Sequence, residues 1–166
     1  MVSLMKYYHL DVIYEPGLKG LMTLLSIFDN LIEFHVPNVH AVFVSFKIKY
    51  FFIKLTNLKK KLNIGAHQFA NKWFLTLFCC VFPIEVVYKI WDMYICDSWV
   101  AVGKIGVAII KLSEENLVKI SSFEEILVYF DNLPSHLKDA NLLLKTALSI
   151  DIKKTTFYVM YETTKQ

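Results

Sequence analysis

The sequence predicts an all-α protein, an irregular multi-helix bundle, and three observations support that prediction. Of its 166 residues 55% are apolar, which is ample material for a buried core. Apolar residues recur at three- and four-residue steps along much of the chain, the spacing of one helix face. Prolines and capping residues separate these runs in the manner of helix ends.

The first part of the chain contains two runs with different periodicities. After the turn signal Pro16-Gly17, helical spacing over residues 18–34 is shown by Leu18, Leu21, Leu25, Phe28, Leu31 and Ile32. Over residues 44–61 the apolar residues alternate instead, and the lysines include Lys47, Lys49, Lys59, Lys60 and Lys61. This period of two predicts a strand-like or irregular insertion. The lysines are interpreted as a solvated face, with contact to an anionic membrane surface as the alternative.

Three apolar helices are expected in the middle of the chain. Residues 66–80 are apolar around the whole circumference of a helix, so this helix is predicted to be central and buried. Pro83 begins the next helix, over residues 84–96, and its predicted core-facing residues are Val86, Val87, Ile90, Trp91, Tyr94 and Ile95. The third helix covers residues 99–112, where Gly103 and Gly106 would allow another helix to approach closely.

Amphipathic helices are expected in the last third of the chain. Ser122 and Glu125 have the spacing of a capping box, and Pro134 marks a stop and a new start. A further helix is indicated by Leu137, Leu142, Leu144, Ala147 and Leu148. Residues 151–166, rich in threonine and lysine, are expected to be a C-terminal tail or a last helix.

Composition and spacing exclude several classes of protein. A membrane-spanning helix needs about 18 apolar residues, whereas the run over residues 73–84 contains Pro83 and meets Glu85. The net charge of +3 is too small to indicate nucleic-acid binding. The histidines lack the spacing of a metal site, and the chain has no glycine-rich phosphate loop, so we predict neither a metal nor a cofactor. Cys79, Cys80 and Cys96 are interpreted as buried, reduced thiols.

The middle of the chain carries a set of motifs that resembles a known family. In order and at matching separations, the chain has Phe69-Ala70, Trp73-Phe74-Leu75-Thr76-Leu77-Phe78, Pro83 and Ile90-Trp91-Asp92. These motifs resemble the C-terminal half of the TBC domain, the all-helical module of GTPase-activating proteins for Rab-type small GTPases. The likeness covers residues 4–150 apart from 44–61. It implies a Rab-type GTPase as partner, a role in vesicle traffic, and a cytoplasmic location at or near endomembranes.

The resemblance also implies which catalytic groups to look for. TBC catalysis uses an arginine from an Ile-x-x-Asp-x-x-Arg motif and a glutamine from a Tyr-x-Gln motif, both N-terminal to the part matched here. This chain has no arginine, and its only glutamines, Gln68 and Gln166, lie outside any Tyr-x-Gln. We therefore expect a partial domain over residues 1–150 with no catalytic residue of its own. The alternative is a noncatalytic helical module that binds a small GTPase or another helical protein.

The matched motif is interpreted as structural rather than catalytic, because aromatic residues at helical spacing usually form a core. Its residues are Phe69, Trp73, Phe74, Thr76, Phe78, Pro83, Ile90, Trp91 and Asp92. The Asp92 carboxylate is expected to accept a hydrogen bond from a nearby backbone or indole N–H. Two departures from the family pattern stand out. Asp97-Ser98 replaces the usual Glu-Gly, and residues 44–61 are either a lysine-rich surface loop or translated intron sequence.

Overall fold

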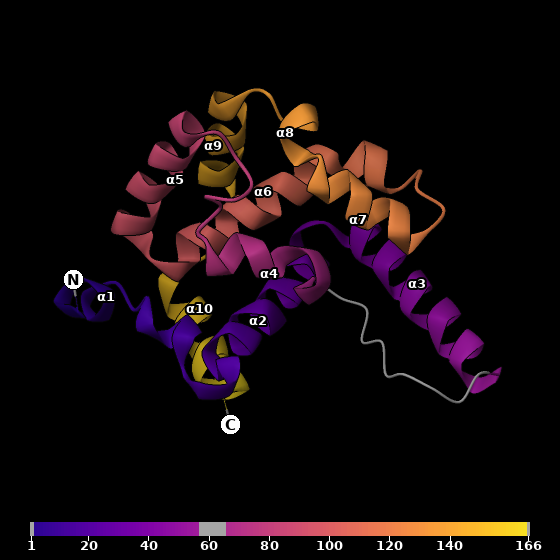
Figure 1. Ribbon diagram of the computed structural model, residues 1–166, viewed down its shortest axis with the longest axis horizontal. Coiled ribbons are helices and arrows are strands. Elements are labelled where there is room, and N and C mark those ends of the chain that lie inside the picture. The colour runs from indigo at the N-terminus through magenta and orange to yellow at the C-terminus, as the bar shows by residue number, and fades with distance from the viewer. Residues whose placement is uncertain (1, 57–65, 166) are drawn as a thin grey trace.

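A computed structural model describes residues 2–56 and 66–165, with side chains described for residues 5–49 and 66–165. Every regular element within these ranges is a helix (Figure 1), so the predicted all-α class is confirmed. The α-helices are α1 (Val2–Tyr7), α2 (Lys19–His35), α3 (Pro37–Thr56), α4 (His67–Leu75), α5 (Ile84–Asp97), α6 (Trp99–Leu117), α7 (Phe123–Asp131), α8 (Leu133–His136), α9 (Ala140–Ser149) and α10 (Lys154–Thr164). Two short 3-10 helices, η1 (Asp11–Tyr14) and η2 (Pro16–Leu18), precede α2.

Helix α6 is the centre of the bundle. It contacts α2, α3, α4, α5 and α9, and Figure 1 shows it crossing the middle of the molecule. Its side chains from Trp99 to Ile110 are buried apart from that of Lys104, which is half-buried. The Lys104 ammonium lies 3.8 Å from the Asp97 carboxylate, which also pairs with Lys154 at 2.8 Å. Residues 66–80 do not form one helix, because α4 ends at Leu75. Phe69, Ala70, Trp73 and Phe74 of α4 are buried as predicted, but α6 holds the central position.

Helix α4 ends earlier than its apolar pattern predicts because the chain turns sharply after it. Leu77 and Phe78 have φ angles of 45° and 64°, in the left-handed region that stops a helix. The Phe78 amide donates to the Trp73 carbonyl at 2.9 Å and closes the turn. A left-handed residue other than glycine costs about 1 kcal/mol. Burial of both side chains, at 5% and 0% exposed, offsets that cost.

Helix α3 corrects the prediction of a strand-like or irregular segment at 44–61. Residues 37–56 form one continuous helix, and residues 57–61 lie outside the described part. Val39, Phe43 and Phe46 are buried and share one face, since they are spaced by four and three residues. The Phe43 ring lies 5.6 Å from Phe69 and the Phe46 ring 6.4 Å from Phe123. These contacts on one helical face outweigh the local alternation of lysines.

Helices α2 and α6 pack closely, as the glycines of α6 predicted. A Cβ atom added at Gly106 would lie 2.6 Å from Cε2 of Phe28. Helix α10 packs on the same helix α2, where Phe157 is buried. The capping box at α7 is also confirmed, because the Glu125 amide donates to Ser122 Oγ at 3.2 Å.

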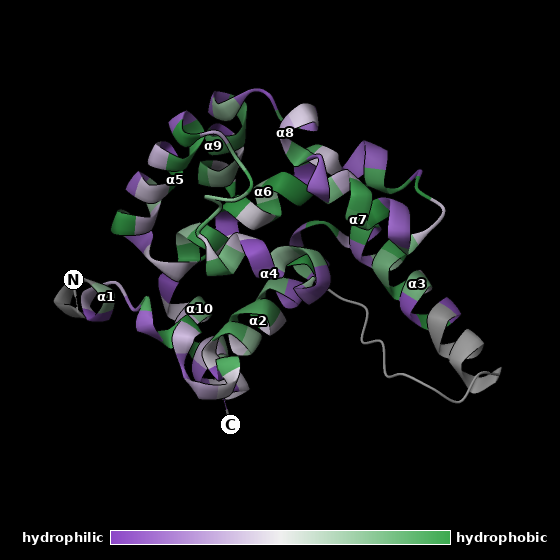
Figure 2. Ribbon diagram, viewed as in Figure 1, coloured by the Kyte–Doolittle hydropathy of each residue, from purple (hydrophilic) through white to green (hydrophobic). Residues whose placement is uncertain are grey.

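An aromatic cluster fills the space between α2, α4 and α7. The Trp73 side chain is fully buried, and its ring centroid lies 5.2–6.2 Å from those of Phe28, Phe69, Phe78 and Phe130. Figure 2 shows hydrophobic residues concentrated where these helices meet α6. The α2 carboxylate of Asp29 accepts a hydrogen bond from the Ala66 amide at 2.9 Å, which fixes the entry into α4. The motif aromatics therefore form the core of the fold.

Ser98, the single residue between α5 and α6, is in a strained conformation. Its φ of 53° and ψ of −137° suit glycine and few other residues. Ser98 Oγ donates to the Tyr8 carbonyl at 3.3 Å, a bond that only partly offsets the strain. We expect Ser98→Gly to raise the free energy of unfolding by about 1 kcal/mol and the melting temperature by about 2–4 °C. Ser98→Ala, which keeps the strain and loses the bond, should lower both in the same thermal denaturation assay.

Candidate protein-binding surface

The structure divides the nine motif residues between the core and the surface. Phe69, Trp73, Phe74, Phe78 and Ile90 are buried together, and Thr76 is half-buried beside them. Pro83, Trp91 and Asp92 are exposed. A surface component of the motif therefore lies on α5 and at its start.

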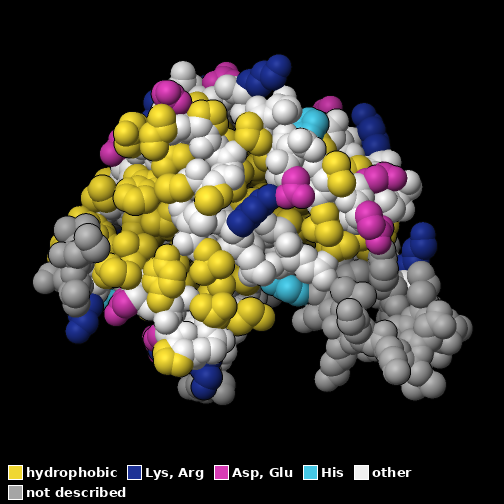
Figure 3. Space-filling model, viewed as in Figure 1, with side chains coloured by type: hydrophobic (Ala, Val, Ile, Leu, Met, Phe, Trp, Pro, Cys, Tyr) yellow, Lys and Arg dark blue, Asp and Glu magenta, His cyan; other side chains and the backbone are white. Residues whose placement is uncertain are grey.

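Four large apolar side chains form a continuous row on the outer face of α5. This α5 outer stripe consists of Ile84, Tyr88, Trp91 and Ile95, which are 51%, 65%, 42% and 53% exposed. Their spacing of four, three and four residues places them on one side of the helix. Figure 3 shows hydrophobic side chains gathered over α5 at the left of the molecule. An exposed apolar surface of this kind is typical of a site that contacts another macromolecule.

The exposure of Trp91 and Ile95 corrects the prediction that both pack inward. Each residue advances a helix by about 100°, and the core-facing positions are held by Val87, Ile90 and Tyr94. Trp91 and Ile95 each follow one of these residues directly, so they point away from the core. Sequence reasoning also missed Ile84 and Tyr88. The sequence did contain a signal for this exposed row. Helix α5 carries two apolar rows, and a helix that packs on a single core buries only one of them.

Polar groups border the α5 outer stripe. Lys89 Nζ donates to Asn141 Oδ1 at 2.9 Å and ties α5 to α9. The indole Nε1 of Trp91 donates to the Leu77 carbonyl at 3.3 Å and ties α5 to the turn after α4. The hydrogen bond expected for Asp92 is not found: within the described part of the chain its exposed carboxylate has no partner. Asp92 is therefore a free negative charge beside the stripe.

The three cysteines are exposed, which corrects the prediction that they are buried. Cys79 and Cys80 lie in the turn between α4 and α5, and Cys96 lies near the end of α5. All three thiols are free. Cys79 and Cys80 are exposed because Leu77 and Phe78, which directly precede them in the turn, occupy the buried positions.

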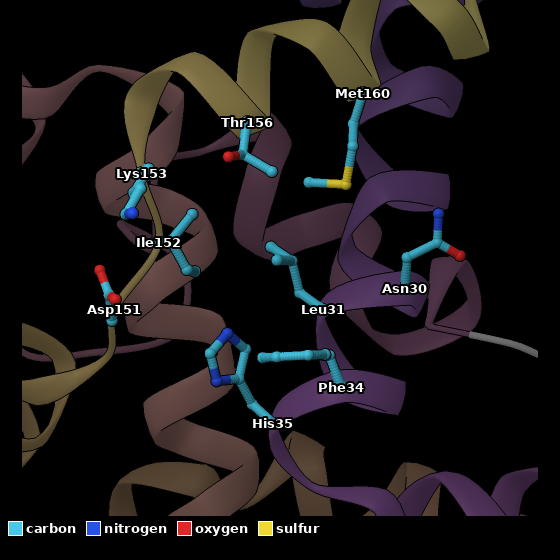
Figure 4. A pocket seen from close by; sticks show the side chains of 9 residues that line it. All are labelled: Asn30, Leu31, Phe34, His35, Asp151, Ile152, Lys153, Thr156 and Met160. Carbon is cyan, nitrogen blue, oxygen red and sulfur yellow. The ribbon is translucent and has the colours of Figure 1, made fainter.

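A cavity of about 530 Å³ lies between α2 and α10, and its lining includes His35, Asp151 and Lys153. Figure 4 shows Phe34 and His35 of α2 close to one another, with Asp151 and Lys153 on the opposite wall. His35 has no side-chain hydrogen bond within the described residues, so no Ser-His-Asp arrangement forms there. Burial lowers the pKa of His35, Lys111 lowers it further, and Asp151 opposes the shift.

The lowered pKa of His35 predicts a loss of stability in mild acid. Because the folded state disfavours the charged imidazole, the unfolded chain binds a proton more readily as the pH falls through about 6.5. The free energy of unfolding should therefore fall as the pH drops from about 7.5 to 5.5. His35→Gln should show a smaller fall over the same range in urea titrations. An identical pH dependence in the variant and the original chain would contradict this assignment.

The described residues contain neither a cluster of metal ligands nor a membrane-spanning helix. No three His, Cys, Asp or Glu side chains within residues 5–49 and 66–165 are grouped as metal ligands are. No helix in the described ranges is both long and apolar enough to cross a membrane. What the described residues contain is an all-helical domain with an exposed apolar stripe on α5.

Comparison with known proteins gives the family. Residues 1–118 match the family model of the Rab-GTPase-TBC domain, which is more than half of the chain. The chain belongs to this family.

Several similar proteins are named as GTPase-activating proteins. The chain is 32% identical over 139 residues to GTPase-activating protein GYP5 of Saccharomyces cerevisiae, which covers 84% of this chain and 13% of that protein. It is 29% identical over 169 residues to GTPase activating protein Gyp51 of Schizosaccharomyces pombe, covering 92% of this chain and 14% of that protein. It is 26% identical over 126 residues to Rab GTPase-activating protein tbc-11 of Caenorhabditis elegans, covering 72% of this chain and 13% of that protein. The chain thus spans about one seventh of these relatives.

Proposed function

We propose that this chain forms the C-terminal part of a TBC-type GTPase-activating domain that acts on a Rab-type small GTPase. Membership of the Rab-GTPase-TBC family, in a chain that contains no arginine, is the observation that carries the proposal. In this role the helices supply a scaffold and part of the surface that meets the GTPase. The groups that act on the nucleotide come from sequence outside these 166 residues.

The chemistry explains why an arginine is required. Negative charge builds on the phosphoryl oxygens during GTP hydrolysis, and an arginine finger that neutralises it is worth a factor of about 10³–10⁵ in rate. Lysine has a point charge and lacks the planar fork that contacts two oxygens at once. All 18 basic residues counted as lysine or arginine in this chain are lysines, so none can replace the finger.

The position of the one glutamine in the described part supports the proposal that this chain carries no glutamine finger. Gln68 lies in the first turn of α4, half-buried, and lines a cavity of about 210 Å³ together with Lys72 and Asp131. Lys72 and Asp131 form an ion pair across this cavity. Gln68 is thus held in the wall between α4 and α7, rather than on a projecting loop that could orient a water molecule in a partner's site.

A GTP hydrolysis assay tests this proposal. The purified chain is mixed with a panel of GTP-loaded Rab-type GTPases, with a TBC domain that carries both fingers as the positive control. We expect the chain to leave the intrinsic rate of every GTPase unchanged within about twofold, since the charge-neutralising group is missing. Circular dichroism confirms that the chain is folded. A stimulation of a hundredfold or more by the chain alone would overturn the proposal.

A second candidate function is a noncatalytic module that binds a helical partner, and the α5 outer stripe favours it. Light scattering separates the two functions: a stable, monodisperse monomer supports a self-sufficient module, and association through exposed apolar surface supports an incomplete domain. Trp91→Ser and Tyr88→Ser should reduce any association. Phe34→Ser serves as the matched control, because Phe34 is 80% exposed on α2, away from the stripe.

The proposed location is the cytoplasm, at the endomembranes where Rab-type GTPases direct vesicle traffic. On α3, Lys47 is half-buried and Lys49 is exposed. Two such lysines support contact with an anionic surface only weakly. Co-sedimentation with vesicles tests that contact. Binding that does not change with the content of anionic lipid would remove lysine-mediated membrane association from the proposal.

A further inference from the structure

A separate cavity of about 250 Å³ lies between η1, α2, the start of α6 and α10. Its lining includes four aromatic residues, Trp99, Phe157, Tyr158 and Tyr161, together with His9 and Glu162. Trp99 and Phe157 are each 2% exposed and belong to the buried end of the cavity. Tyr158, at 37% exposed, lies toward the solvent.

The deepest ring of this cavity is held in a fixed orientation. Trp99 Nε1 donates to the His9 carbonyl at 2.9 Å, and the Trp99 ring stacks on Phe74 with centroids 6.3 Å apart and planes 2° apart. Tyr94 packs edge-on against Trp99 at 5.5 Å. A ring fixed by a hydrogen bond and two aromatic neighbours loses little freedom when a ligand binds.

The charges around the cavity are mainly negative. Burial raises the pKa of Tyr161, and the nearby carboxylates of Glu15, Glu162 and Asp11 raise it further. Lys165 lies beside these carboxylates, and its ammonium is 3.9 Å from the Glu15 carboxylate. The same ammonium lies 5.7 Å from the centre of the Tyr161 ring, so this ring already interacts with a cation of its own chain.

We propose that this cavity binds a small organic cation that carries a methylated ammonium group, as choline does. Aromatic rings attract cations through the negative charge of their faces, and the carboxylates add to that attraction. The largely apolar lining favours a methylated group over a strongly hydrated ion, because an inorganic cation would lose its water shell there. The same group occurs free and in the headgroup of phosphatidylcholine. The free cation is favoured, since Glu162 and its acidic neighbours would repel a lipid phosphate.

Calorimetric titration of the full chain with choline chloride tests the proposal. The matched control ligand is 3,3-dimethyl-1-butanol, which has the shape of choline and no charge. We expect choline to bind on the order of tenfold more tightly than this neutral analogue, as expected for a cation at an aromatic site. A second titration with phosphatidylcholine vesicles distinguishes the lipid headgroup from the free cation.

Variants of partly exposed residues locate the binding without disturbing the core. Tyr158→Leu and Glu162→Gln should each weaken choline binding several-fold, whereas Tyr88→Leu on α5 should leave it unchanged. Circular dichroism and melting curves verify that all three variants are folded. Four results would each overturn the proposal: no choline binding, equal binding of the neutral analogue, binding to vesicles alone, or an equal loss in Tyr88→Leu.

Discussion

Trp73→Ala is expected to lower the free energy of unfolding by about 3–5 kcal/mol, the usual cost of removing a large buried aromatic side chain. Trp73 is fully buried, and its ring contacts four phenylalanines from α2, α4, α7 and the turn after α4. Alanine leaves a cavity that these fixed rings cannot fill. Since domains are stable by only about 5–15 kcal/mol, the variant should lie close to its unfolding threshold. Urea denaturation followed by circular dichroism measures the loss.

Two further substitutions serve as controls for Trp73→Ala. Trp73→Phe keeps most of the ring and removes an indole N–H that has no partner among the described residues, so its cost should be much smaller. Trp91→Ala removes the other motif tryptophan, which is 42% exposed, and should cost clearly less, about 1–3 kcal/mol. If Trp91→Ala destabilised the chain as much as Trp73→Ala, the division of the motif into core and surface would be wrong.

Gly106→Ala is expected to destabilise the protein by about 1–3 kcal/mol, the cost of overpacking a core. The direction of this change in the free energy of unfolding is informative, because replacing glycine by alanine inside a helix normally stabilises a protein by about 0.5–1 kcal/mol. The new Cβ would lie 2.6 Å and 2.8 Å from ring atoms of Phe28. Phe28 is 1% exposed and packs on Phe74 at 5.5 Å, so its ring has no room to withdraw.

Gly103→Ala is the matched control on the same helix. Its Cβ would meet a terminal methyl group of Leu31 at 3.1 Å and Phe157 at 3.4 Å, and the Leu31 methyl can rotate away. We expect a change within about 1 kcal/mol of zero. The Gly106→Ala, Phe28→Leu double variant should recover part of the stability lost in Gly106→Ala, since leucine frees space at the contact. A stabilising Gly106→Ala would show that α2 and α6 are not in close contact at this point.

The helices whose apolar residues follow one face were predictable from the sequence. Residues 18–34 and the capping box at Ser122 each correspond to an observed helix or helix start, because the packed face and the cap are local signals. The close approach at Gly106 was also predictable, since small residues are what permit it. The family motif indicated the Rab-GTPase-TBC family, which the family match confirms.

Other features depend on contacts that the sequence does not display. The left-handed residues Leu77 and Phe78 end α4, and neither is a residue type associated with that conformation. The alternation near Phe46 resembled a strand, and only packing against Phe123 decides in favour of a helix. Trp91 belongs to a helix with two apolar rows, and periodicity alone cannot say which row faces the core. These errors concern tertiary environment rather than local propensity.

The hydrogen bond between Trp91 and the Leu77 carbonyl has a practical consequence. It joins the α5 outer stripe to the turn that carries Cys79 and Cys80, both freely accessible to reagents. A macromolecule that covers Trp91 and extends over this turn would shield the two thiols. The rate at which these thiols are alkylated, followed by mass spectrometry, therefore reports whether the stripe is covered.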